Sequence, residues 1–485
     1  MKKIFLIFYF LLLYNLQAEL LKDFDANGLL KSERNYIKKI LRSEKFYLDG
    51  KKHGSFKKYF PTGKVSSEIN YSNDKLDGLS KVFYKTGRLK TKEYYIEGKK
   101  EGTFKRYNKI GILLEEQNYK MGLKNGEFKK FYKTGEIKSV KSYKSNKPNG
   151  NSFTYDRKGK ILTQVTYEKG NLTSEKYYFN TVKIGTFKNY YNNGQLKKEF
   201  TYKQGLLSGP ANEYYKSGNL QSEKYYKKGK KDGVFSNYYS NGTLQSTVAY
   251  KMDNIKSEKY YKNGLKHGIF KEYYDSGKLY HETSYVDDDQ KGKENTYYET
   301  GELQSEKNFK GGLQVGKYEK YFLSGDIEIQ SNFKNGIQEG ESNIFFKNGQ
   351  LKSKSFFKDN KTDGLYKEYR PTGELLFETN YINGIKNGPA TKYYQSGNIE
   401  QEHYYTNDKL NGTIKEYYGI GALSSITPYI NGKPNGQMNK YYIDGSLKMT
   451  ITFNKGKALK GATYLEHGTK KELTHAHFNN MGLEY

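Results

Sequence analysis

Two histidines near the carboxyl end have the spacing that most readily suggests metal chemistry. His475 and His477 are separated by one residue. Alternate side chains of a β-strand point to the same face, so an extended segment here would turn both imidazoles toward one metal ion. A lone histidine pair without cysteine or acidic partners is more often a polar part of a chain end than a ligand set. We therefore expect no metal site.

Two other segments resemble ligand loops, and neither is complete. Gly311 to Lys317 begins like a phosphate-binding loop, but Tyr318 occupies the position where such a loop needs Ser or Thr. Asp287 to Asp289 is a short acidic run, which is conceivable as a calcium site but is more simply a solvated turn. We expect no bound cofactor.

Almost every other polar residue that stands out does so because it recurs. Glycines open sixteen repeats, nearly always twenty-four residues apart, and another glycine follows each of them nine residues later. A catalytic site requires a set of groups that occurs once, so this repetition argues against an enzyme and predicts no catalytic residues. The opening glycines are Gly54, Gly78, Gly102, Gly126, Gly150, Gly185, Gly209, Gly233, Gly268, Gly292, Gly316, Gly340, Gly364, Gly388, Gly412 and Gly436.

We number each repeat from its opening glycine, which is position 0. Position 5 is aromatic in all sixteen repeats, position 11 is always Leu, Ile or Val, and position 17 is again aromatic. Where the repeat is uninterrupted, position 20 is Gly, Asn or Asp, the residue types that tolerate positive φ. Position 20 is therefore expected to be a turn residue in the left-handed conformation.

Short runs rich in aromatic and branched residues lie between these turns, such as Phe56 to Phe60 and Val65 to Tyr71. They predict two β-strands per repeat. Folding the first hairpin about position 8 places position 5 opposite position 11, and the next turn would bring position 17 opposite position 3 or 5 of the following repeat. Positions 5, 11 and 17 would then share one aromatic face, and a recurrent Glu at position 14 would lie among lysines on the opposite, solvated face.

Three intervals are thirty-five residues long, those that begin at Glu19, Gly150 and Gly233. Each contains an added copy of a second strand. An antiparallel meander accepts one extra strand, whereas a coil with one repeat per turn would lose its register. We therefore expect an all-β fold, an elongated repeat array of antiparallel β-hairpins, rather than a β-solenoid. The added pieces are Leu41 to Gly50, Leu172 to Thr181 and Ile255 to Gly264.

The same boundaries predict the domain organisation. Residues 1–18 read as a signal peptide, because Lys2 and Lys3 precede an apolar run, Ile4 to Leu16, that is short for a membrane span. The alternative is an uncleaved anchor. Residues 19–53 form an atypical first repeat, residues 54–460 form sixteen repeats with longer ones at 150–184 and 233–267, and residues 461–485 form a C-terminal cap. We expect an exported protein of the periplasm, the outer surface or the surrounding medium.

The chain is strongly basic, with 83 Lys and Arg against 53 Asp and Glu and a formal net charge of +30. The lysines are distributed through every repeat. One interpretation is a preference for acidic partners, such as an anionic glycan or lipid surface, with nucleic acid less expected. The other is that lysines keep a sheet with exposed edges from aggregating.

Position 6 is aromatic in thirteen of the sixteen repeats. Because adjacent residues of a strand point to opposite faces, we expect position 6 to lie on the face opposite position 5, among the lysines and glutamates. Tyrosine combines a large contact area with a hydrogen-bonding group, which favours binding. The alternative is cross-strand stacking that stiffens the sheet. The candidate binding residues are Tyr84, Tyr132, Tyr191, Tyr215, Tyr239, Tyr274, Tyr298, Tyr394, Tyr418 and Tyr442.

The order of glycines and aromatics resembles the bacterial variant of the MORN repeat over about residues 19–461. The resemblance implies antiparallel hairpins in a long, twisted sheet that serves as a scaffold or binding surface without catalysis. It also implies relatives labelled as antitoxins of toxin–antitoxin pairs, and large exported fusobacterial members with a suggested role at the host interface. Eukaryotic relatives tend to bear Trp and to associate with membranes, whereas this chain has no Trp. The motif is complete at Tyr214, Tyr215, Gly218, Leu220, Glu223, Tyr226, Gly229 and Gly233.

A second resemblance, to repeats that bind choline or cell-wall glycan, is weaker because those repeats use Trp in their ligand cages. The sequence therefore predicts an exported, non-enzymatic binding array that engages a protein or an anionic glycan or lipid surface at the bacterial envelope. The alternatives are an antitoxin or immunity-type protein that neutralises a toxin, and a structural spacer that binds nothing.

Overall fold

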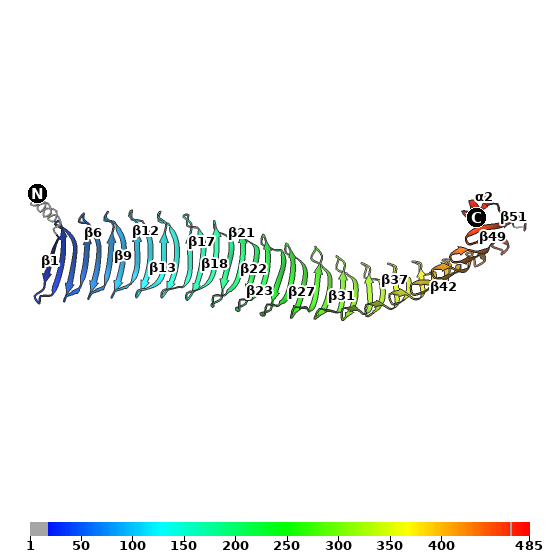
Figure 1. Ribbon diagram of the computed structural model, residues 1–485, viewed down its shortest axis with the longest axis horizontal. Helices are drawn as coiled ribbons and strands as arrows, with labels where there is room; N and C mark the ends of the chain where they lie inside the picture. The colour runs from blue at the N-terminus through cyan, green and yellow to red at the C-terminus, as the bar shows by residue number, and fades with distance from the viewer. Residues whose placement is uncertain (1–17, 466–467) are drawn as a thin grey trace, which may run out of the picture. The chain divides into compact units, whose positions relative to one another are not determined.

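The computed structural model describes residues 18–465 and 468–485, and the chain divides into two compact units, Met1–Thr243 and Leu244–Tyr485. Within each unit the strands lie side by side in chain order and pair antiparallel with their neighbours (Figure 1). The described residues include one short helix, near the C-terminus. The predicted all-β fold of antiparallel hairpins is therefore confirmed. The predicted signal peptide lies, apart from Ala18, outside the described residues.

The first unit contains strands of two, six, seven, eight or nine residues. They are β1 (Ala18–Phe24), β2 (Leu30–Ile37), β3 (Ile40–Leu48), β4 (Lys51–Lys52), β5 (Gly54–Tyr59), β6 (Val65–Ser72), β7 (Lys75–Leu76), β8 (Gly78–Phe83), β9 (Leu89–Ile96), β10 (Lys99–Lys100), β11 (Gly102–Tyr107), β12 (Leu113–Lys120), β13 (Leu123–Phe131), β14 (Ile137–Lys144), β15 (Lys147–Pro148), β16 (Gly150–Tyr155), β17 (Ile161–Glu168), β18 (Asn171–Phe179), β19 (Val182–Lys183), β20 (Gly185–Tyr190), β21 (Leu196–Lys203), β22 (Leu206–Tyr214), β23 (Leu220–Lys227), β24 (Lys230–Lys231) and β25 (Gly233–Tyr238).

The second unit repeats this order and adds the helix. Its elements are β26 (Leu244–Lys251), β27 (Asn254–Lys262), β28 (Leu265–Lys266), β29 (Gly268–Tyr273), β30 (Leu279–Val286), β31 (Asp289–Tyr297), β32 (Leu303–Lys310), β33 (Leu313–Gln314), β34 (Gly316–Tyr321), β35 (Ile327–Lys334), β36 (Ile337–Gln338), β37 (Gly340–Phe345), β38 (Leu351–Lys358), β39 (Lys361–Thr362), β40 (Gly364–Tyr369), β41 (Leu375–Ile382), β42 (Ile385–Tyr393), β43 (Ile399–Thr406), β44 (Lys409–Leu410), β45 (Gly412–Tyr417), β46 (Leu423–Ile430), β47 (Lys433–Pro434), β48 (Gly436–Tyr441), β49 (Leu447–Asn454), β50 (Lys457–Tyr464), β51 (Lys470–Glu472) and α2 (His475–Asn480).

Each repeat begins with a hairpin of fixed register. Between β5 and β6, Gly54 pairs with Tyr71 and Tyr59 pairs with Val65, so position 5 lies opposite position 11, as predicted. The register shifts just before Tyr59, because the residue at position 12 has no partner on the facing strand. This extra residue is a β-bulge, and the same shift recurs in the last repeat, between β48 and β49.

The bulge corrects the predicted assignment of faces. Because side chains alternate along a strand, positions 2, 4, 13, 15 and 17 share one face, whereas positions 5 and 11 join positions 3 and 14 on the other. Tyr214 at position 5 accordingly donates a hydrogen bond to Glu199 at position 14 of the preceding repeat (2.8 Å). The prediction that positions 5 and 17 share a face was wrong, because a one-residue bulge leaves no signature in the hydrophobic pattern.

The second connection of each repeat is a tight turn with two left-handed residues. Asn73 and Asp74 have φ values of 48° and 66°, and Ser72 pairs with Lys75 across them. Positive φ at both central residues defines a type I′ turn, whose twist matches that of the flanking strands. The predicted left-handed residue at position 20 is confirmed, and position 19 shares its conformation.

Beyond this turn the register differs from the prediction. Tyr71 at position 17 pairs with Leu76 at position 22, and Glu68 at position 14 pairs with Lys81 at position 3 of the next repeat. Position 17 therefore does not lie opposite position 3 or 5. Four residues separate Leu76 from Lys81 while only two separate Glu68 from Tyr71, so the strand is irregular around the opening glycine, Gly78. We call the face with positions 2, 4, 13, 15, 17 and 22 the aromatic face, and the face with positions 1, 3, 5, 14 and 16 the charged face.

The opening glycine is required for two reasons. Its φ is positive in all sixteen repeats, from 70° to 115°, a region that side-chain-bearing residues avoid. In several repeats the neighbouring strand also approaches closely. A Cβ at Gly436 would lie 2.9 Å from Cγ of Pro428, and one at Gly209 would lie 3.3 Å from Cβ of Thr201.

The added strands fit as predicted. β18 pairs antiparallel with β17 on one side and with β20 on the other, and β27 does the same between β26 and β29. β3 lies in the same way between β2 and β5. One inserted strand reverses the direction of the strands that follow it, but the antiparallel pairing continues without a gap. This confirms the prediction of a hairpin array rather than a β-solenoid.

Successive type I′ turns are joined by hydrogen bonds. The backbone N–H at position 20 donates to the carbonyl at position 22 of the preceding repeat, from Asp74 to Lys52 (3.0 Å) and from Gly98 to Leu76 (2.7 Å). Where position 20 is Asp or Asn, its side chain also accepts a bond, as Oδ1 of Asp74 does from the Lys52 N–H (2.9 Å). This turn ladder satisfies backbone groups outside the strand pairing and fixes each turn against the next.

A compact apolar cluster lies at the C-terminal hairpins. Phe478 of α2 is 1% exposed and packs with Met438, Ile451 and Phe453, which occupy aromatic-face positions of the last repeat. The backbone N–H of Leu473 donates to the carbonyl of Gly461 (2.8 Å). Residues from Leu473 onward thus cover the aromatic face at this end, where no further hairpin follows among the described residues.

Alanine substitution at two opening glycines should separate their two roles. Gly316 has φ of 71° and no atom within 4 Å of the place that a Cβ would occupy, so Gly316→Ala should cost about 1 kcal/mol from backbone strain alone. Gly436→Ala adds the contact with Pro428 at a φ of 112°, and should cost about 2–4 kcal/mol. Urea denaturation of both variants measures the difference. Equal losses would contradict the role of the close approach.

Candidate binding surfaces

The aromatic face carries rings that pack laterally across the strands. The ring centroid of Phe187 at position 2 lies 5.5 Å from that of Tyr178 and 4.7 Å from that of Tyr202. Phe128 lies in the same way between Tyr119 (5.3 Å) and Tyr143 (4.9 Å). Each such pair contributes about 0.5–1.5 kcal/mol beyond the burial of its area. These rings therefore stabilise the sheet while remaining at its surface.

Lysines at position 22 lie over the same rings. Nζ of Lys100 is 4.7 Å from the ring centroid of Phe104 and 5.2 Å from that of Tyr119. Cation–π contacts of this kind contribute about 0.5–1 kcal/mol at exposed sites. The aromatic face is thus a surface on which ammonium groups are held above half-buried rings.

The charged face is largely neutralised by its own side chains. Glu68 at position 14 lies 3.7 Å from Lys57 of its own hairpin and 3.7 Å from Lys81 of the next. Tyr417 at position 5 donates a hydrogen bond of 2.6 Å to Glu402. Exposed ion pairs contribute little, about 0–1 kcal/mol each, so this network orders side chains more than it stabilises the fold. It confirms the predicted pairing of the recurrent glutamate with lysine.

These hydrogen bonds shift the ionisation of both partners. Burial, followed by the hydrogen bond to Glu402, raises the pKa of Tyr417 to about 12. Burial and the bond to Glu175 raise the pKa of Tyr190 to about 12 in the same way. The Tyr417 hydroxyl, helped by Lys415, holds the pKa of Glu402 below its ordinary value. Tyr417 and Tyr190 therefore stay neutral donors, and Glu402 stays a charged acceptor, over the physiological range.

The tyrosines predicted for binding lie at the ends of the first hairpins, where they are half-buried. Their hydroxyls donate to the backbone carbonyl at position 5 of the next repeat, as from Tyr84 to Tyr107 (2.8 Å) and from Tyr191 to Tyr214 (2.8 Å). Tyr239 occupies the equivalent position of its hairpin. The same bond is made by Tyr132, Tyr215, Tyr274, Tyr298, Tyr394 and Tyr418, and Tyr442 donates to Tyr464.

This tyrosine ladder joins repeats at the hairpin end opposite the turn ladder. Arg370, which replaces the tyrosine in its repeat, supplies the equivalent bond from its guanidinium to the carbonyl of Tyr393 (2.6 Å). The position thus has a structural role made by hydrogen bonding, to which Tyr274 adds a ring contact with Tyr280 (5.0 Å). Tyr132 lines a hollow together with Phe128 and Tyr143 of the aromatic face and with Lys129 and Tyr155 of the charged face.

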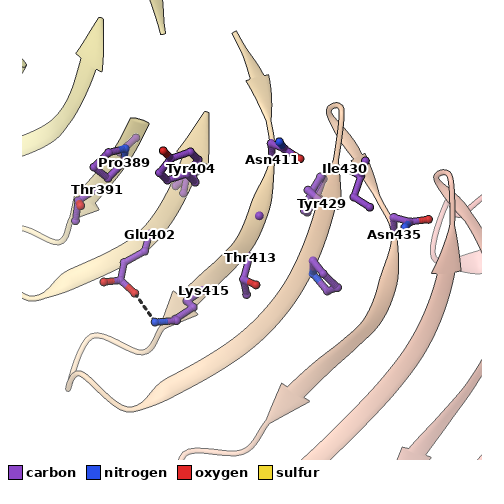
Figure 2. Close-up of a pocket in the computed structure, with 14 residues that line it drawn as sticks. Pro389, Thr391, Glu402, Tyr404, Asn411, Thr413, Lys415, Tyr429, Ile430 and Asn435 are labelled. Atoms are coloured by element: carbon purple, nitrogen blue, oxygen red, sulfur yellow. Dashed lines mark ion pairs between the residues drawn. The ribbon is translucent and has the colours of Figure 1, made fainter. Parts of the chain in front are cut away.

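A hollow of about 800 Å³ lies on the charged face of the second unit (Figure 2). Tyr404 of β43 lies within it, 49% exposed, with Pro389 on the adjacent strand β42 and Pro428 on β46, beyond β45. The ion pair between Glu402 and Lys415 (3.3 Å) leaves little net charge at one side of the hollow. An exposed tyrosine between prolines offers the mixed apolar and hydrogen-bonding contact that protein interfaces use.

The segments that suggested metal or phosphate chemistry have other roles. His475 and His477 lie on α2 rather than on a strand, so they do not share a face as expected for an extended segment. Nδ1 of His477 lies 3.0 Å from the backbone N of Thr474, and the His475 ring stacks on Tyr485 with centroids 4.5 Å apart. Asp287 and Asp288 form a type I′ turn, in which Oδ1 of Asp288 accepts the Lys266 N–H (2.7 Å).

Gly311 and Gly312 form another type I′ turn, and the strand β34 follows them where a phosphate-binding loop would lead into a helix. In the described part of the chain, no group of three or more His, Cys, Asp or Glu side chains is placed to hold a metal ion. None of the helices in that part is long and apolar enough to cross a membrane.

Sequence reasoning missed the phenylalanines at position 2 and the lysines at position 22. Position 2 is Phe in only some repeats and is Ser, Ala, Tyr, Ile, Met or Glu in others, so it lacks the invariance that identified positions 5 and 17. The bulge places position 2 next to the aromatic residue at position 17. Knowledge of the bulge would therefore have predicted that position 2 is buried. Position 22 could not be distinguished from the many other lysines without that register.

A family model described as the MORN repeat variant matches this chain twelve times, over more than half of its 485 residues. Each match begins just after the type I′ turn of one repeat and ends at or just before that of the next, so it spans nearly one period. The matches cover residues 52–73, 76–97, 124–145, 183–204, 207–228, 231–252, 266–287, 290–310, 314–335, 338–359, 362–383 and 386–407.

Solved structures with local similarity come from toxin complexes. The crystal structure of TcdB2-TccC3-Cdc42 is 12% identical, with a TM-score of 0.14, over 95% of this chain and 31% of that chain. A structure of the Photorhabdus luminescens Tc holotoxin pore is 11% identical, with a TM-score of 0.11, over 97% of this chain and 28% of that chain. This chain spans less than a third of these two structures, and such TM-scores carry no functional inference. No curated protein sequence matches the chain.

Removal of one ladder hydroxyl should weaken the fold. Tyr191→Phe deletes the bond to the Tyr214 carbonyl, so we expect the free energy of unfolding to fall by about 1 kcal/mol. Tyr225→Phe is a matched control, because that ring is 49% exposed and its hydroxyl makes no hydrogen bond to the described residues. Urea denaturation of both variants measures the effect. A loss at Tyr225 as large as that at Tyr191 would show that the ladder contributes nothing specific.

The raised pKa of Tyr417 predicts a loss of stability at high pH. The unfolded tyrosine ionises near pH 10 and the folded one near 12, so its contribution is complete below pH 10 and is lost between pH 10 and 12. Denaturation curves at stepwise pH should show a shallower decline in Tyr417→Phe than in the parent protein. Identical slopes would mean that the hydrogen bond to Glu402 does not hold this phenol protonated.

Proposed function

Because the chain belongs to the MORN repeat variant family, we propose that it is an exported, non-enzymatic scaffold. It binds a protein or an anionic polymer at the bacterial envelope or cell surface. The apolar sequence from Ile4 to Leu16, preceded by two lysines, supports export. Catalysis has no part in this proposal, because the side chains that stand out recur in repeat after repeat.

The observation that carries this proposal is the recurrence of register from one repeat to the next. Each ordinary repeat adds a pair of long strands, and neighbouring strands lie about 4.8 Å apart, so equivalent side chains recur about every 10 Å within a compact unit. A ligand that is itself repetitive, or that is large enough to cover several repeats, can then make the same contact several times. Weak individual contacts add up through the high effective concentration of the next one.

The two faces offer different chemistry to such ligands. The aromatic face presents ammonium groups over rings, as at Lys100 and Lys124, which suits anionic polymers. The charged face presents tyrosines and paired charges, as in the hollow around Tyr404, which suits a protein. The net charge of +30 adds a general attraction for acidic partners.

Deletion of complete repeats tests this proposal. Removal of residues 316–339 or of residues 340–363 takes out one period each and leaves the remaining register in phase. The full-length protein and both deletion variants, immobilised and exposed to envelope extracts of the bacterium and of host cells, should capture the same components. We expect each single deletion to weaken capture severalfold at most, and the double deletion to weaken it further.

An abrupt loss of capture with one deletion, and none with the other, would contradict a distributed scaffold and indicate a single local site. Capture of nothing by the full-length protein would favour a spacer without a ligand. Circular dichroism of each variant shows whether the strands are retained.

A further inference from the structure

One hollow on the aromatic face of the first unit gathers several lysines beside aromatic rings. It has a volume of about 560 Å³ and is lined by strands β12 to β14, β16 and β17 and by Tyr132 at a hairpin end. Lys124, Lys130 and Lys141 line it together with the rings of Phe128 and Tyr143. A smaller hollow of about 240 Å³ continues from it and shares Lys141, Tyr143 and Thr154.

These three lysines have no carboxylate within ion-pairing distance among the described residues, and for Lys141 this differs from the equivalent lysines of other repeats. Lys141 occupies position 15, and the lysines at position 15 in two other repeats are paired. Lys224 lies 3.4 Å from Glu213, and Lys307 lies 2.9 Å from Glu294. The residue that faces Lys141 across the strand pair is Phe128, which cannot neutralise it.

The charge of this region is therefore uncompensated. Its one carboxylate at an aromatic-face position, Glu115, is already held by Arg106, with an N–O distance of 2.5 Å. The ionisable residues at aromatic-face positions of the two repeats that begin at Gly102 and Gly126 are Arg106, Lys124, Lys130, Lys141 and Glu115, four basic and one acidic, or +3. Lys124 is fixed by its rings, with Nζ 5.2 Å from the centroid of Tyr143. Glu115 also faces Lys130 across strands β12 and β13, so Lys124 and Lys141 are the ammonium groups that an anion in the hollow would meet without an acidic residue facing them.

The neighbouring groups favour a hydroxylated ligand over a stacked base. Phe128 packs at 58° against Tyr143 and at 63° against Tyr119, and Lys124 lies over it, so its ring has no free face for a nucleobase. Ser139 and Thr154, which pair across strands β14 and β16, bring two hydroxyls to the same hollow. Hydroxyls beside ammonium groups and ring edges match a sugar that carries an acidic group.

We propose that this lysine hollow is a subsite for one acidic sugar residue of an anionic polysaccharide. The acidic group lies among Lys124, Lys130 and Lys141, the sugar hydroxyls bond to Ser139 and Thr154, and the sugar C–H groups contact the rings of Phe128 and Tyr143. This inference rests on the proposed function of the array as a binding scaffold, and assigns its strongest anionic contact to one place on it.

The test compares two triple variants of the full-length protein that lose the same charge. K124Q/K130Q/K141Q removes three of the five lysines that line the hollow and leaves Lys129, which pairs with Glu127, and Lys138. K85Q/K109Q/K216Q removes three exposed lysines at hairpin ends, away from the hollow. Titration calorimetry with polygalacturonate, which carries carboxylates, and with dextran sulfate shows which acidic group is preferred. Neutral dextran and oligothymidylate serve as comparison ligands, and K124R/K130R/K141R tests whether charge in the hollow is sufficient.

We expect the hollow variant to bind the acidic polysaccharide at least about tenfold more weakly than the parent, and the hairpin-end variant to lose no more than about twofold. The arginine variant should retain most of the affinity, which excludes a loss caused by misfolding. Equal losses in the two glutamine variants would overturn the subsite and leave only attraction by net charge.

Tighter binding of oligothymidylate than of either polysaccharide, with the same dependence on the hollow, would replace the sugar by nucleic acid and overturn the proposal. Absence of binding to both acidic polysaccharides would also overturn it. The proposed scaffold function would survive that result if the repeat deletions still reduced capture of a protein in a graded way, so the two failures are distinguishable.

Discussion

The structure depends on one constraint: each sheet is a single layer, so a strand can gain stability only from the strands beside it. In the described part of the chain no second layer covers either face of the repeats before the C-terminal cluster, and most large side chains remain half-buried. Before the last repeat, most of the buried apolar residues of the described repeats are at position 2, as in Phe187, Phe235 and Phe270, each beside tyrosines of neighbouring strands. Lateral ring packing, strand pairing and the two ladders at the hairpin ends therefore supply what a core supplies in a globular domain.

Three backbone features decide which side chains meet in this layer. The bulge at position 12, the type I′ turn at positions 19 and 20, and the left-handed opening glycine each recur once per repeat. Together they bring position 2 beside position 17 on one face and position 5 beside position 14 on the other. The result is two chemically different surfaces, one of rings and ammonium groups and one of paired charges and tyrosines. Substitutions within either surface leave the backbone pattern intact, which allows local specialisation such as the uncompensated lysines around Lys141.

Much of this was accessible from the sequence. The glycine period indicated the hairpin array, the residue types at position 20 indicated the left-handed turn, and the eleven-residue insertions indicated extra strands in a meander. The sequence could not show which side chains share a face of the sheet. Side chains alternate between the two faces along a strand, so a bulge that shifts the register by one residue exchanges the faces. For the same reason position 2 went unrecognised, and the hydrogen bonds from the position-6 tyrosines to the next repeat were not predicted. The helix at His475 was hidden by its short length, since its stability comes from Phe478 packing on the last hairpins.

The arrangement of the two faces is tested most directly by double-mutant cycles from Phe187. Its ring lies 4.7 Å from that of Tyr202 at position 17, whereas Tyr190 at position 5 points to the opposite face and bonds to Glu175. Phe187→Leu combined with Tyr202→Leu should show a coupling free energy of about 0.5–1.5 kcal/mol in urea denaturation. Combined with Tyr190→Leu it should show less than about 0.5 kcal/mol. A stronger coupling to Tyr190 than to Tyr202 would mean that the aromatic residues at positions 2 and 5 share a face, and would contradict the two-faced sheet.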